Sequence, residues 1–281
     1  LRWSDSTAPI PSDFRLINAF EPSGSFDDLN ALLGSRYVRP RRRYLSGFLP
    51  DGIISHHIGD CQDSAMVSYG YEWLADPVHI ASIFRGTPFA MSSDALNVPA
   101  AWLTYTYPKI CFKGHIDWVF AGRSYFSHAL NAFWQDKVMP TIHIFIEELP
   151  SELSASLVAR LAELAAESVT GPSTVNATGT TVFFNIDALV HRHNDWYMSL
   201  RMRSRRTQGN EDFESKGKTF HAGSGVLQAR VHGDEYDYVR ARYDWHVLPG
   251  VTEEWRTDAI PTGSSGKYRC GGNEDAGAVA D

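Results

Sequence analysis

The sequence has little of what would place it in several common protein classes. Its 281 residues include only three cysteines, which is too few for a disulfide framework, and no paired Cys-x-x-Cys motif of a structural zinc site. It has no apolar run long enough to cross a bilayer. Basic residues are outnumbered, 26 against 33 acidic ones. We therefore expect no metal, no membrane and no nucleic acid as partner, and an anionic ligand would need a local basic site.

Aromatic and apolar residues, by contrast, are abundant. The chain is 43% hydrophobic and 12% Phe, Trp or Tyr. The length of 281 residues suffices for one large domain or two ordinary ones. The composition can bury a sizeable core and supplies rings for stacking on sugars. An N-glycosylation pattern at residues 176–178 hints at secretion.

The periodicity of the chain changes near residue 170. Before it, apolar residues recur at the spacing of helices, and beyond a Gly/Ser/Thr-rich loop the period becomes two, which predicts strands. Helices followed by strands predict an α+β protein of two parts, residues 1–170 and 171–281. The expected helices are residues 26–33, 69–74 and 78–84 around Pro77, 123–138 ending before Pro140, and 151–168 capped by Ser151, with 100–107 and 116–120 as helix or buried turn. The expected strands are residues 181–186, 195–203, 225–231 and 236–245.

Candidate chemistry is concentrated in residues 50–74, PDGIISHHIGDCQDSAMVSYGYEWL. A turn signal opens this stretch, and histidines and tyrosines follow it. Histidine titrates near neutral pH, and a tyrosine of lowered pKa can take and return a proton. A His and a Tyr held side by side would therefore suit acid–base catalysis, although a structural role is the commoner one for such a pair.

Residues 36–43 form a basic run. Arg39 and Arg43 belong to it, and arginine binds carboxylate and sulfate groups in a fork geometry. The run is either a solvated loop or a rim that attracts a polyanion.

The stretch 50–74 resembles the active-site segment of the hyaluronate and chondroitin lyases, polysaccharide lyase family 8. In that family a His lies six residues after the Asp of an Asp-Gly turn, as His57 does after Asp51, and a catalytic Tyr before Gly follows. The resemblance implies His57 and Tyr69 as catalytic residues. The gap between them is longer than the family's, so Tyr71 stays an alternative to Tyr69, which is preferred because Gly70 follows it.

Four later segments resemble the same family in the same order. Residues 117–124 are similar to its Gly-Arg-Ser segment, which implies an active-site role for Arg123, although Ser127 stands where the family has a second Arg. Residues 213–225 resemble its Glu-Asn-x-Lys-Gly segment and imply that Glu214 is the active-site Glu. The remaining matches are residues 191–200, similar to the strand that opens the sheet domain, and residues 243–252, similar to an aromatic and Leu-Pro-Gly-Thr-Thr signature.

The resemblance implies a helical toroid followed by an antiparallel β-sandwich, and β-elimination on a uronate polysaccharide such as chondroitin or hyaluronan. His57 would neutralise the substrate carboxylate, Tyr69 would act as base and acid, Arg123 would lower the pKa of Tyr69, and Glu214 would orient Arg or His. It implies no metal or cofactor. The predicted substrate-binding residues are Arg39, Arg43, Trp118 and Trp245.

Other functions remain open on the sequence alone. The family's chains are much longer, so the remaining segments of a lyase are an expected partner, and its active-site Asn has no match here, since Asn18 and Asn30 lack the context. A non-catalytic carbohydrate-binding or matrix protein with the same fold is therefore the alternative. A glycoside hydrolase would need a pair of carboxylates, for which Asp60, Asp63 and Glu214 show no telling spacing.

Overall fold

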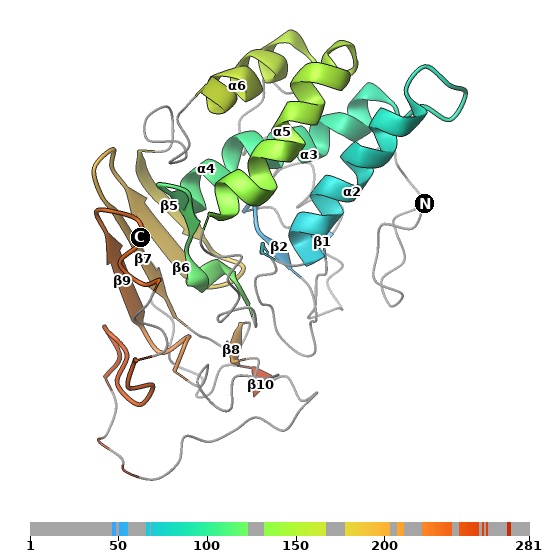
Figure 1. The fold of residues 1–281 in the computed structure, drawn as a ribbon. Helices are drawn as coiled ribbons and strands as arrows, with labels where there is room; N and C mark the ends of the chain where they lie inside the picture. Colours follow the sequence, from blue (N-terminus) through green and yellow to red (C-terminus); the bar gives the residue numbers. More distant parts are fainter. Residues whose placement is uncertain are drawn as a thin grey trace.

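The computed structural model describes residues 47–48, 51–55, 66–67, 69–122, 132–166, 178–202, 207–210, 221–237, 242–252, 255, 257 and 269–270. Helices lie beside a four-stranded antiparallel sheet, which confirms the predicted α+β class (Figure 1). A toroid, a sandwich and a domain boundary at residue 170 stay predictions. The expected helix at 26–33 and the basic run at 36–43 lie outside the described residues.

The helical part begins after a small pair of strands and contains a second small pair. Strands β1 (Gly47–Phe48) and β2 (Ile54–Ser55) are antiparallel, as are β3 (Cys111–Phe112) and β4 (His115–Ile116). The helices are α2 (Tyr69–Phe84), α3 (Ser93–Tyr105), α4 (Tyr107–Ile110), the 3-10 turn η2 (Trp118–Phe120), the run formed by η4 (Trp134–Val138), α5 (Met139–His143) and η5 (Ile144–Glu148), the 3-10 turn η6 (Pro150–Glu152), and α6 (Ala155–Ala166).

Prolines interrupt the helices less than the sequence suggested. Pro77 lies inside α2, so the two predicted pieces are one helix, and the helical run continues past Pro140 through α5 and η5. A proline removes one backbone hydrogen bond, but the apolar residues on either side stay packed in the core, and this tertiary packing outweighs the local preference. Leu74 and Val78 around Pro77, and Ile142 beyond Pro140, are fully buried.

Helix α6 confirms the predicted apolar stripe but not its predicted start. Leu157, Leu161 and Leu164 are buried as expected. The helix begins at Ala155, and the side chain of Ser154, instead of Ser151, accepts a hydrogen bond from the backbone N–H of Leu157 at 3.4 Å. Residues 150–152 form a separate 3-10 turn, so the prediction placed the cap three residues early.

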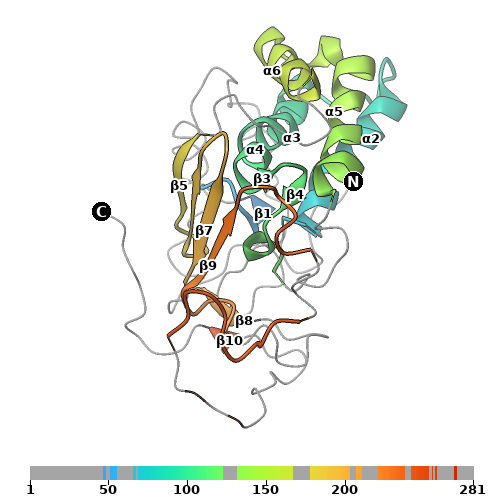
Figure 2. The ribbon, with the colours of Figure 1, turned by 60° about the vertical axis from the view of Figure 1, so that its left-hand side comes forward.

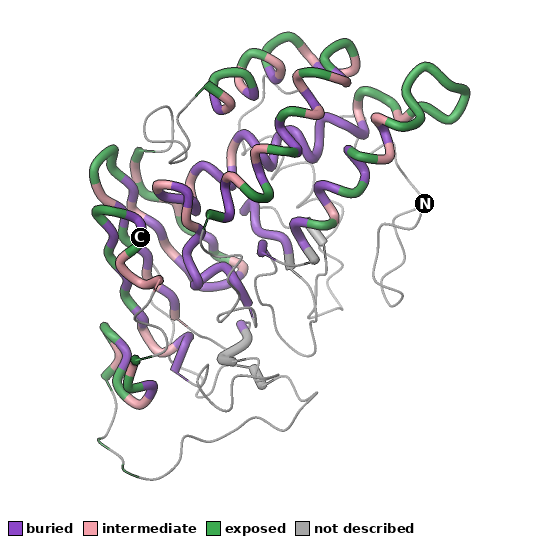
Figure 3. The backbone as a smooth tube through the Cα atoms, viewed as in Figure 1, coloured by how far each residue is buried: buried purple, intermediate pink, exposed green. Residues whose placement is uncertain are grey.

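The sheet is formed by β5 (Gly179–Phe183), β6 (Ala188–Arg192), β7 (Tyr197–Arg201) and β9 (Val226–Arg230), in that spatial order. Each neighbouring pair is antiparallel, and its register sets Arg192, Tyr197 and Arg230 side by side in one row. Figure 2 shows β3 and β4 of the helical part next to this sheet, and Figure 3 shows buried backbone where the two parts face each other. A separate pair is β8 (Gln208–Asn210) with β10 (Arg269–Cys270).

The face of the sheet that is buried against the helical part carries arginines. Arg192, Arg201 and Arg230 are almost fully buried, whereas Met198 and Leu227 on the opposite face are exposed. The Arg192 guanidinium donates to the backbone carbonyls of Pro108 and Cys111, and Arg201 donates to that of Val119 at 3.1 Å. The alternation in 195–203 therefore buries its more polar half, in which Arg201, like Arg192 of β6, finds a backbone acceptor across the interface.

A buried carboxylate completes this interface. Ser199 donates its hydroxyl to Asp117 at 2.6 Å, and the other carboxylate oxygen of Asp117 accepts from the backbone N–H of Val119 at 2.9 Å. Asp117 is 1% exposed and Ser199 is fully buried. One hydrogen-bonded pair thus joins β7 to the start of η2.

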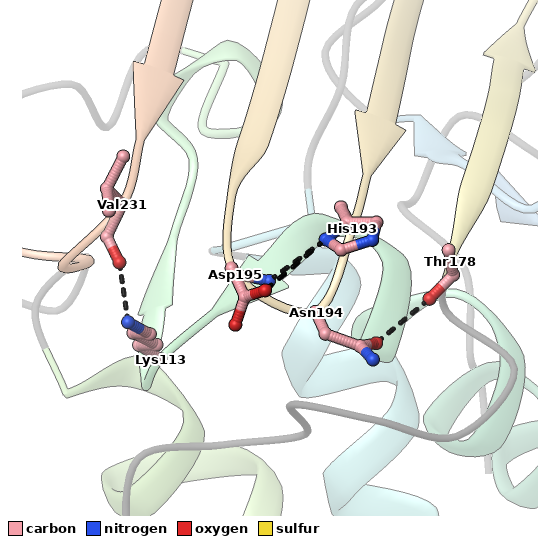
Figure 4. Close-up of polar contacts among 6 residues, drawn as sticks. All are labelled: Lys113, Thr178, His193, Asn194, Asp195 and Val231. Carbon is pink, nitrogen blue, oxygen red and sulfur yellow. Dashed lines mark hydrogen bonds and ion pairs between the residues drawn. The ribbon is translucent and has the colours of Figure 1, made fainter.

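Polar contacts also hold the ends of the strands (Figure 4). Lys113, between β3 and β4, donates to the carbonyl of Val231 just beyond β9 at 2.5 Å. In the turn between β6 and β7, the backbone N–H of Asp195 donates to the ring of His193 at 3.4 Å. The helical part and the sheet are therefore joined at this end of the strands as well as across the buried face.

The predicted strand at 236–245 is wrong for the residues described there, which form turns. The hydroxyl of Tyr236 donates to the carbonyl of Ala229 and accepts from its N–H, both at 3.0 Å. The carboxylate of Glu235 accepts from the backbone N–H groups of Val231, His232 and Gly233. These side chains take the hydrogen bonds that another strand would have made with β9 and the residues after it.

Replacing Ser199 with Ala should lower the free energy of unfolding by about 1–3 kcal/mol, because the buried carboxylate of Asp117 loses a donor. Met198→Thr, on the exposed face of the same strand, is the matched control and should change it by less than about 0.5 kcal/mol. Urea unfolding followed by circular dichroism measures both. Equal losses from the two variants would contradict the assignment of the buried face.

The stability that Glu235 contributes should depend on pH. Burial acts to raise the pKa of this carboxyl group, but the backbone hydrogen bonds from His232, Val231 and Gly233 together outweigh it and lower the pKa to about 2 from 4.5. A carboxyl whose folded pKa is depressed stabilises the fold above its unfolded pKa, and this contribution is lost as the pH falls through the folded value. The stability difference between wild type and Glu235→Gln should thus be full at pH 7 and shrink below about pH 4.5.

Urea unfolding at several pH values between 7 and 3 measures this difference. Asp234→Asn removes a carboxylate from an exposed neighbour and is the control. A difference between wild type and Glu235→Gln that stays constant across this range would refute the role of the carboxylate.

Candidate active site

The predicted catalytic residues lie at the borders of the described segments. Tyr69 is the first residue of α2, and only its backbone is described. His57, Arg123 and Glu214 lie outside the described residues, as do Arg39 and Arg43. The described residues nearest to each predicted catalytic residue show where the chain leaves the described structure before it.

The segment that leads to His57 is anchored to the sheet through Asp51. One carboxylate oxygen of Asp51 accepts from the N–H of Ile53 at 3.3 Å, and the other accepts from the N–H of Asn185, between β5 and β6, at 2.8 Å. Asp51 is buried, and this burial raises the pKa of its carboxyl group while the hydrogen bonds from Asn185 and Ile53 act in the opposite direction. The Asp-Gly turn thus bridges the helical part and the sheet, and Gly52 supplies its positive φ of 89°.

Met66 brings the far end of the same segment back to β2. The N–H of Ile54 donates to the sulfur of Met66 at 3.2 Å, and Tyr107 donates its hydroxyl to the Met66 carbonyl at 2.8 Å. The described residues on either side of 56–65, the range that includes His57, therefore lie together, and Met66 precedes Tyr69 by three residues.

Tyr71, the alternative to Tyr69, is committed to the core. Its hydroxyl donates to the carbonyl of Lys137 and pairs with the hydroxyl of Thr141 at 2.6 Å, and its ring packs edge-on against Phe133 at 5.7 Å. Burial raises the pKa of Tyr71, although the hydrogen bond with Thr141 opposes that shift. A base needs a lowered pKa and a free hydroxyl, so this environment favours Tyr69 over Tyr71.

The segment that leads to Arg123 is anchored at the same place as the Asp-Gly turn. Asp117 caps the 3-10 turn η2, whose last residue, Phe120, packs edge-on against Phe183 at 5.1 Å. Phe183 ends β5 and lies two residues before Asn185, the partner of Asp51. Arg123 follows Phe120 by three residues.

The segment that leads to Glu214 starts from the same turn between β5 and β6. Thr207, fully buried, donates its hydroxyl to the carboxylate of Asp187 at 2.9 Å. Asp187 also accepts from the N–H of Met202, beyond β7, at 2.9 Å through its backbone carbonyl. Glu214 lies seven residues after Thr207.

Trp118 and Trp245, predicted to bind substrate, lie together. Their rings pack edge-on at 5.7 Å, and the ring of Tyr243 stacks on Trp118 at 6.4 Å. The two tryptophans are only 2% and 4% exposed. Two of the matched segments, around residues 118 and 245, thus meet in one aromatic cluster, while a contact of these rings with sugar stays a prediction.

The Leu-Pro-Gly segment lies against the start of β9. Its Pro249 carbonyl accepts from the N–H of Leu227 at 2.9 Å. Gly250 has φ 85°, and a Cβ atom there would lie 2.3 Å from the carbonyl oxygen of Gly225. The close approach therefore requires glycine at position 250, and it joins this segment to the Gly-rich turn at 221–225.

A hollow of about 280 Å³ lies between α2 and η4, beside Tyr71. Its lining includes Glu72, Asp76 and Asp136 together with Lys137. Three carboxylates against one lysine make this hollow a poor site for a polyanion. Within the described part of the chain, no cluster of His, Cys, Asp and Glu is arranged to hold a metal ion, and no helix is long and apolar enough to cross a membrane.

Comparisons with known proteins find similarity to polysaccharide lyases. The family model for the polysaccharide lyase family 8 super-sandwich domain matches residues 178–281. Chondroitinase-AC of Pedobacter heparinus is 24% identical over 222 residues, which cover 76% of this chain and 30% of that protein. The chain is polysaccharide lyase family 8-like.

Solved structures show that the fold of this family 8-like chain is shared with chondroitin lyases. A chondroitinase AC lyase studied in complexes with oligosaccharides matches 90% of this chain and 40% of its own, with a TM-score of 0.67 at 18% identity. The Streptomyces coelicolor A3 chondroitin AC lyase, solved with chondroitin sulphate, matches 90% and 42%, with a TM-score of 0.62 at 17% identity. The chain thus spans less than half the length of these relatives.

Sequence reasoning missed the residues that join these segments. Asp51 was interpreted only as part of a turn, and Asn185, Asp187 and Thr207 were not singled out. A usable signal is the pair Asn185 and Asp187 between two apolar strands, because both residue types favour turns, and Asp187 has a positive φ of 50°. Their long-range partners carry no sequence signal.

Proposed function

We propose that this chain carries the active site of a lyase that cleaves uronate-containing glycosaminoglycans, of the chondroitin or hyaluronan type, by β-elimination. The observation that supports it most is the meeting of three segments at the turn between β5 and β6. Asp51, Phe120 and Thr207 each contact this turn or its edge, and they precede His57, Arg123 and Glu214 by three to seven residues. The shared fold with chondroitin lyases supports the same function.

The proposed reaction needs one base, one acid and one group that neutralises a carboxylate. Tyr69 removes the proton at C5 of the uronate, the C4–O4 bond breaks, and a double bond forms between C4 and C5. The departing O4 takes a proton, which Tyr69 returns. His57 stabilises the negative charge that builds on the substrate carboxylate, because that charge is greatest in the transition state.

The other predicted residues fit supporting roles. Arg123 near Tyr69 lowers the pKa of its hydroxyl, and Glu214 orients Arg123 or His57 from the side of the sheet. Arg39 and Arg43 attract the anionic polymer, while Trp118 and Trp245 support its path. No metal or cofactor takes part in this scheme. We further propose that the protein acts outside the cell, where such polymers occur.

We predict that the chain, incubated with chondroitin or hyaluronan, releases products with the ultraviolet absorbance of an unsaturated uronate. Tyr69→Phe should lower the rate of this rise by about 10²–10⁴-fold, since it removes the proton-transfer group. Tyr71→Phe is the matched control. It should lower the free energy of unfolding by about 1 kcal/mol, through loss of its buried hydroxyl contacts, and keep a rate near that of wild type.

A rise that survives Tyr69→Phe but not Tyr71→Phe would assign the base to Tyr71. No rise on any uronate polymer, with binding of the polymer retained, would favour a non-catalytic carbohydrate-binding protein of the same fold.

A further inference from the structure

We propose that the turn between β5 and β6, residues 184–187, is a positioning element of the active site. It holds the three segments that carry His57, Arg123 and Glu214 at fixed distances from one another. A displacement at one contact is therefore transmitted to the other two. This inference deepens the proposed lyase function and rests on it for its catalytic consequence. It assigns Asp51 and Thr207 as positioning residues.

The turn is suited to this task because backbone hydrogen bonds hold both of its ends. The N–H of Ile186 donates to the carbonyl of Phe183 at 3.2 Å, and both side chains are buried. Asp187 adopts a left-handed backbone with φ 50°, which asparagine and aspartate tolerate better than most residues. Its carbonyl accepts from Met202, so the turn is also tied to β7.

The contact with Asp51 crosses from the sheet to the helical part. The donor is the backbone N–H of Asn185, so its position is set by the turn itself and not by a side-chain rotamer. The acceptor, Asp51, is held on its other oxygen by Ile53, next to β2. Because each oxygen of this carboxylate accepts a hydrogen bond, a displacement of the turn is transmitted directly to β2, the strand that precedes His57.

The contact with Thr207 holds the chain just before β8 against the turn. Its hydroxyl donates to the Asp187 carboxylate, and both residues are buried, so water does not readily replace either partner. Strand β8 begins at the next residue, and the chain continues from it to Glu214.

The third contact adds the segment of Arg123. Phe120 packs on Phe183 at the edge of the turn, and one residue earlier the carbonyl of Val119 accepts from Arg201. Arg201 pairs with Ala188, which directly follows the turn. Ring packing thus holds the end of η2 against β5, which leads into the turn. A charged hydrogen bond holds it against β7, which pairs with the strand that leaves the turn.

The test uses the full chain and two disrupting variants on opposite sides of the turn. Asp51→Ala removes the acceptor of the Asn185 N–H, and Thr207→Val removes the hydroxyl while keeping the side-chain shape. Thr207→Ser restores the hydroxyl and is the conservative rescue. Leu157→Ala, a buried position on α6 that none of the contacts of this turn involves, is the control for lost stability.

Hydrogen exchange followed by mass spectrometry tests the coupling without reference to activity. We expect Thr207→Val to speed exchange about tenfold in residues 51–65, and Asp51→Ala to do the same in residues 203–220, whereas Leu157→Ala leaves both unchanged. Faster exchange confined to each variant's own segment, or an equal effect of Leu157→Ala, would overturn the proposal.

Kinetics on chondroitin test the catalytic consequence. We expect Thr207→Val to lower kcat about 10- to 100-fold with a much smaller change in KM, and Thr207→Ser to restore it, because small displacements of catalytic groups cost rate more than binding. An unchanged kcat in Thr207→Val would overturn the positioning role. A wild type without turnover would instead refute the lyase function, and the exchange result alone would then decide whether the turn couples the segments.

Discussion

Two buried arginines of the sheet, Arg192 and Arg201, donate to backbone carbonyls of the helical part, and this constraint fixes how the two parts meet. A guanidinium group has donors in a rigid planar arrangement, so its acceptors must lie in definite directions. Arg192 binds the carbonyls of Pro108 and Cys111, and Arg201 binds that of Val119. Because a buried charge without partners is very costly, the sheet has little freedom to slide along the helices.

This fixed interface has a direct consequence for the candidate site. The acceptor of Arg201 lies in η2, four residues before Arg123, and Arg201 itself pairs with the strand that leaves the turn between β5 and β6. The same turn holds Asp51 and Thr207. Segments that are far apart in the sequence therefore meet at one point of the interface. A site assembled in this way needs residues from both parts, as the proposed elimination does.

Periodicity and spacing allowed much of this to be predicted, and the misses have physical reasons. The change of period near residue 170 predicted helices followed by a sheet, and the stripe of Leu157, Leu161 and Leu164 was found. Alternation along a strand does not indicate which of its two sets of side chains faces the core. The burial of the arginine-lined face could therefore not be predicted from the sequence. The link from Asp51 to Asn185 spans 134 residues, and no local pattern reports such a contact. Family resemblance supplied the candidate residues, whereas the contacts of Asp51, Phe120 and Thr207, which precede them, came only from the structure.

The most direct test of this account is a crystal structure of the chain with a bound chondroitin tetrasaccharide. The account predicts that His57, Tyr69, Arg123 and Glu214 surround a single uronate ring beside the turn between β5 and β6, with the Tyr69 hydroxyl nearest to C5. An oligosaccharide bound elsewhere, or any of the four side chains lying beyond reach of that ring, would contradict it.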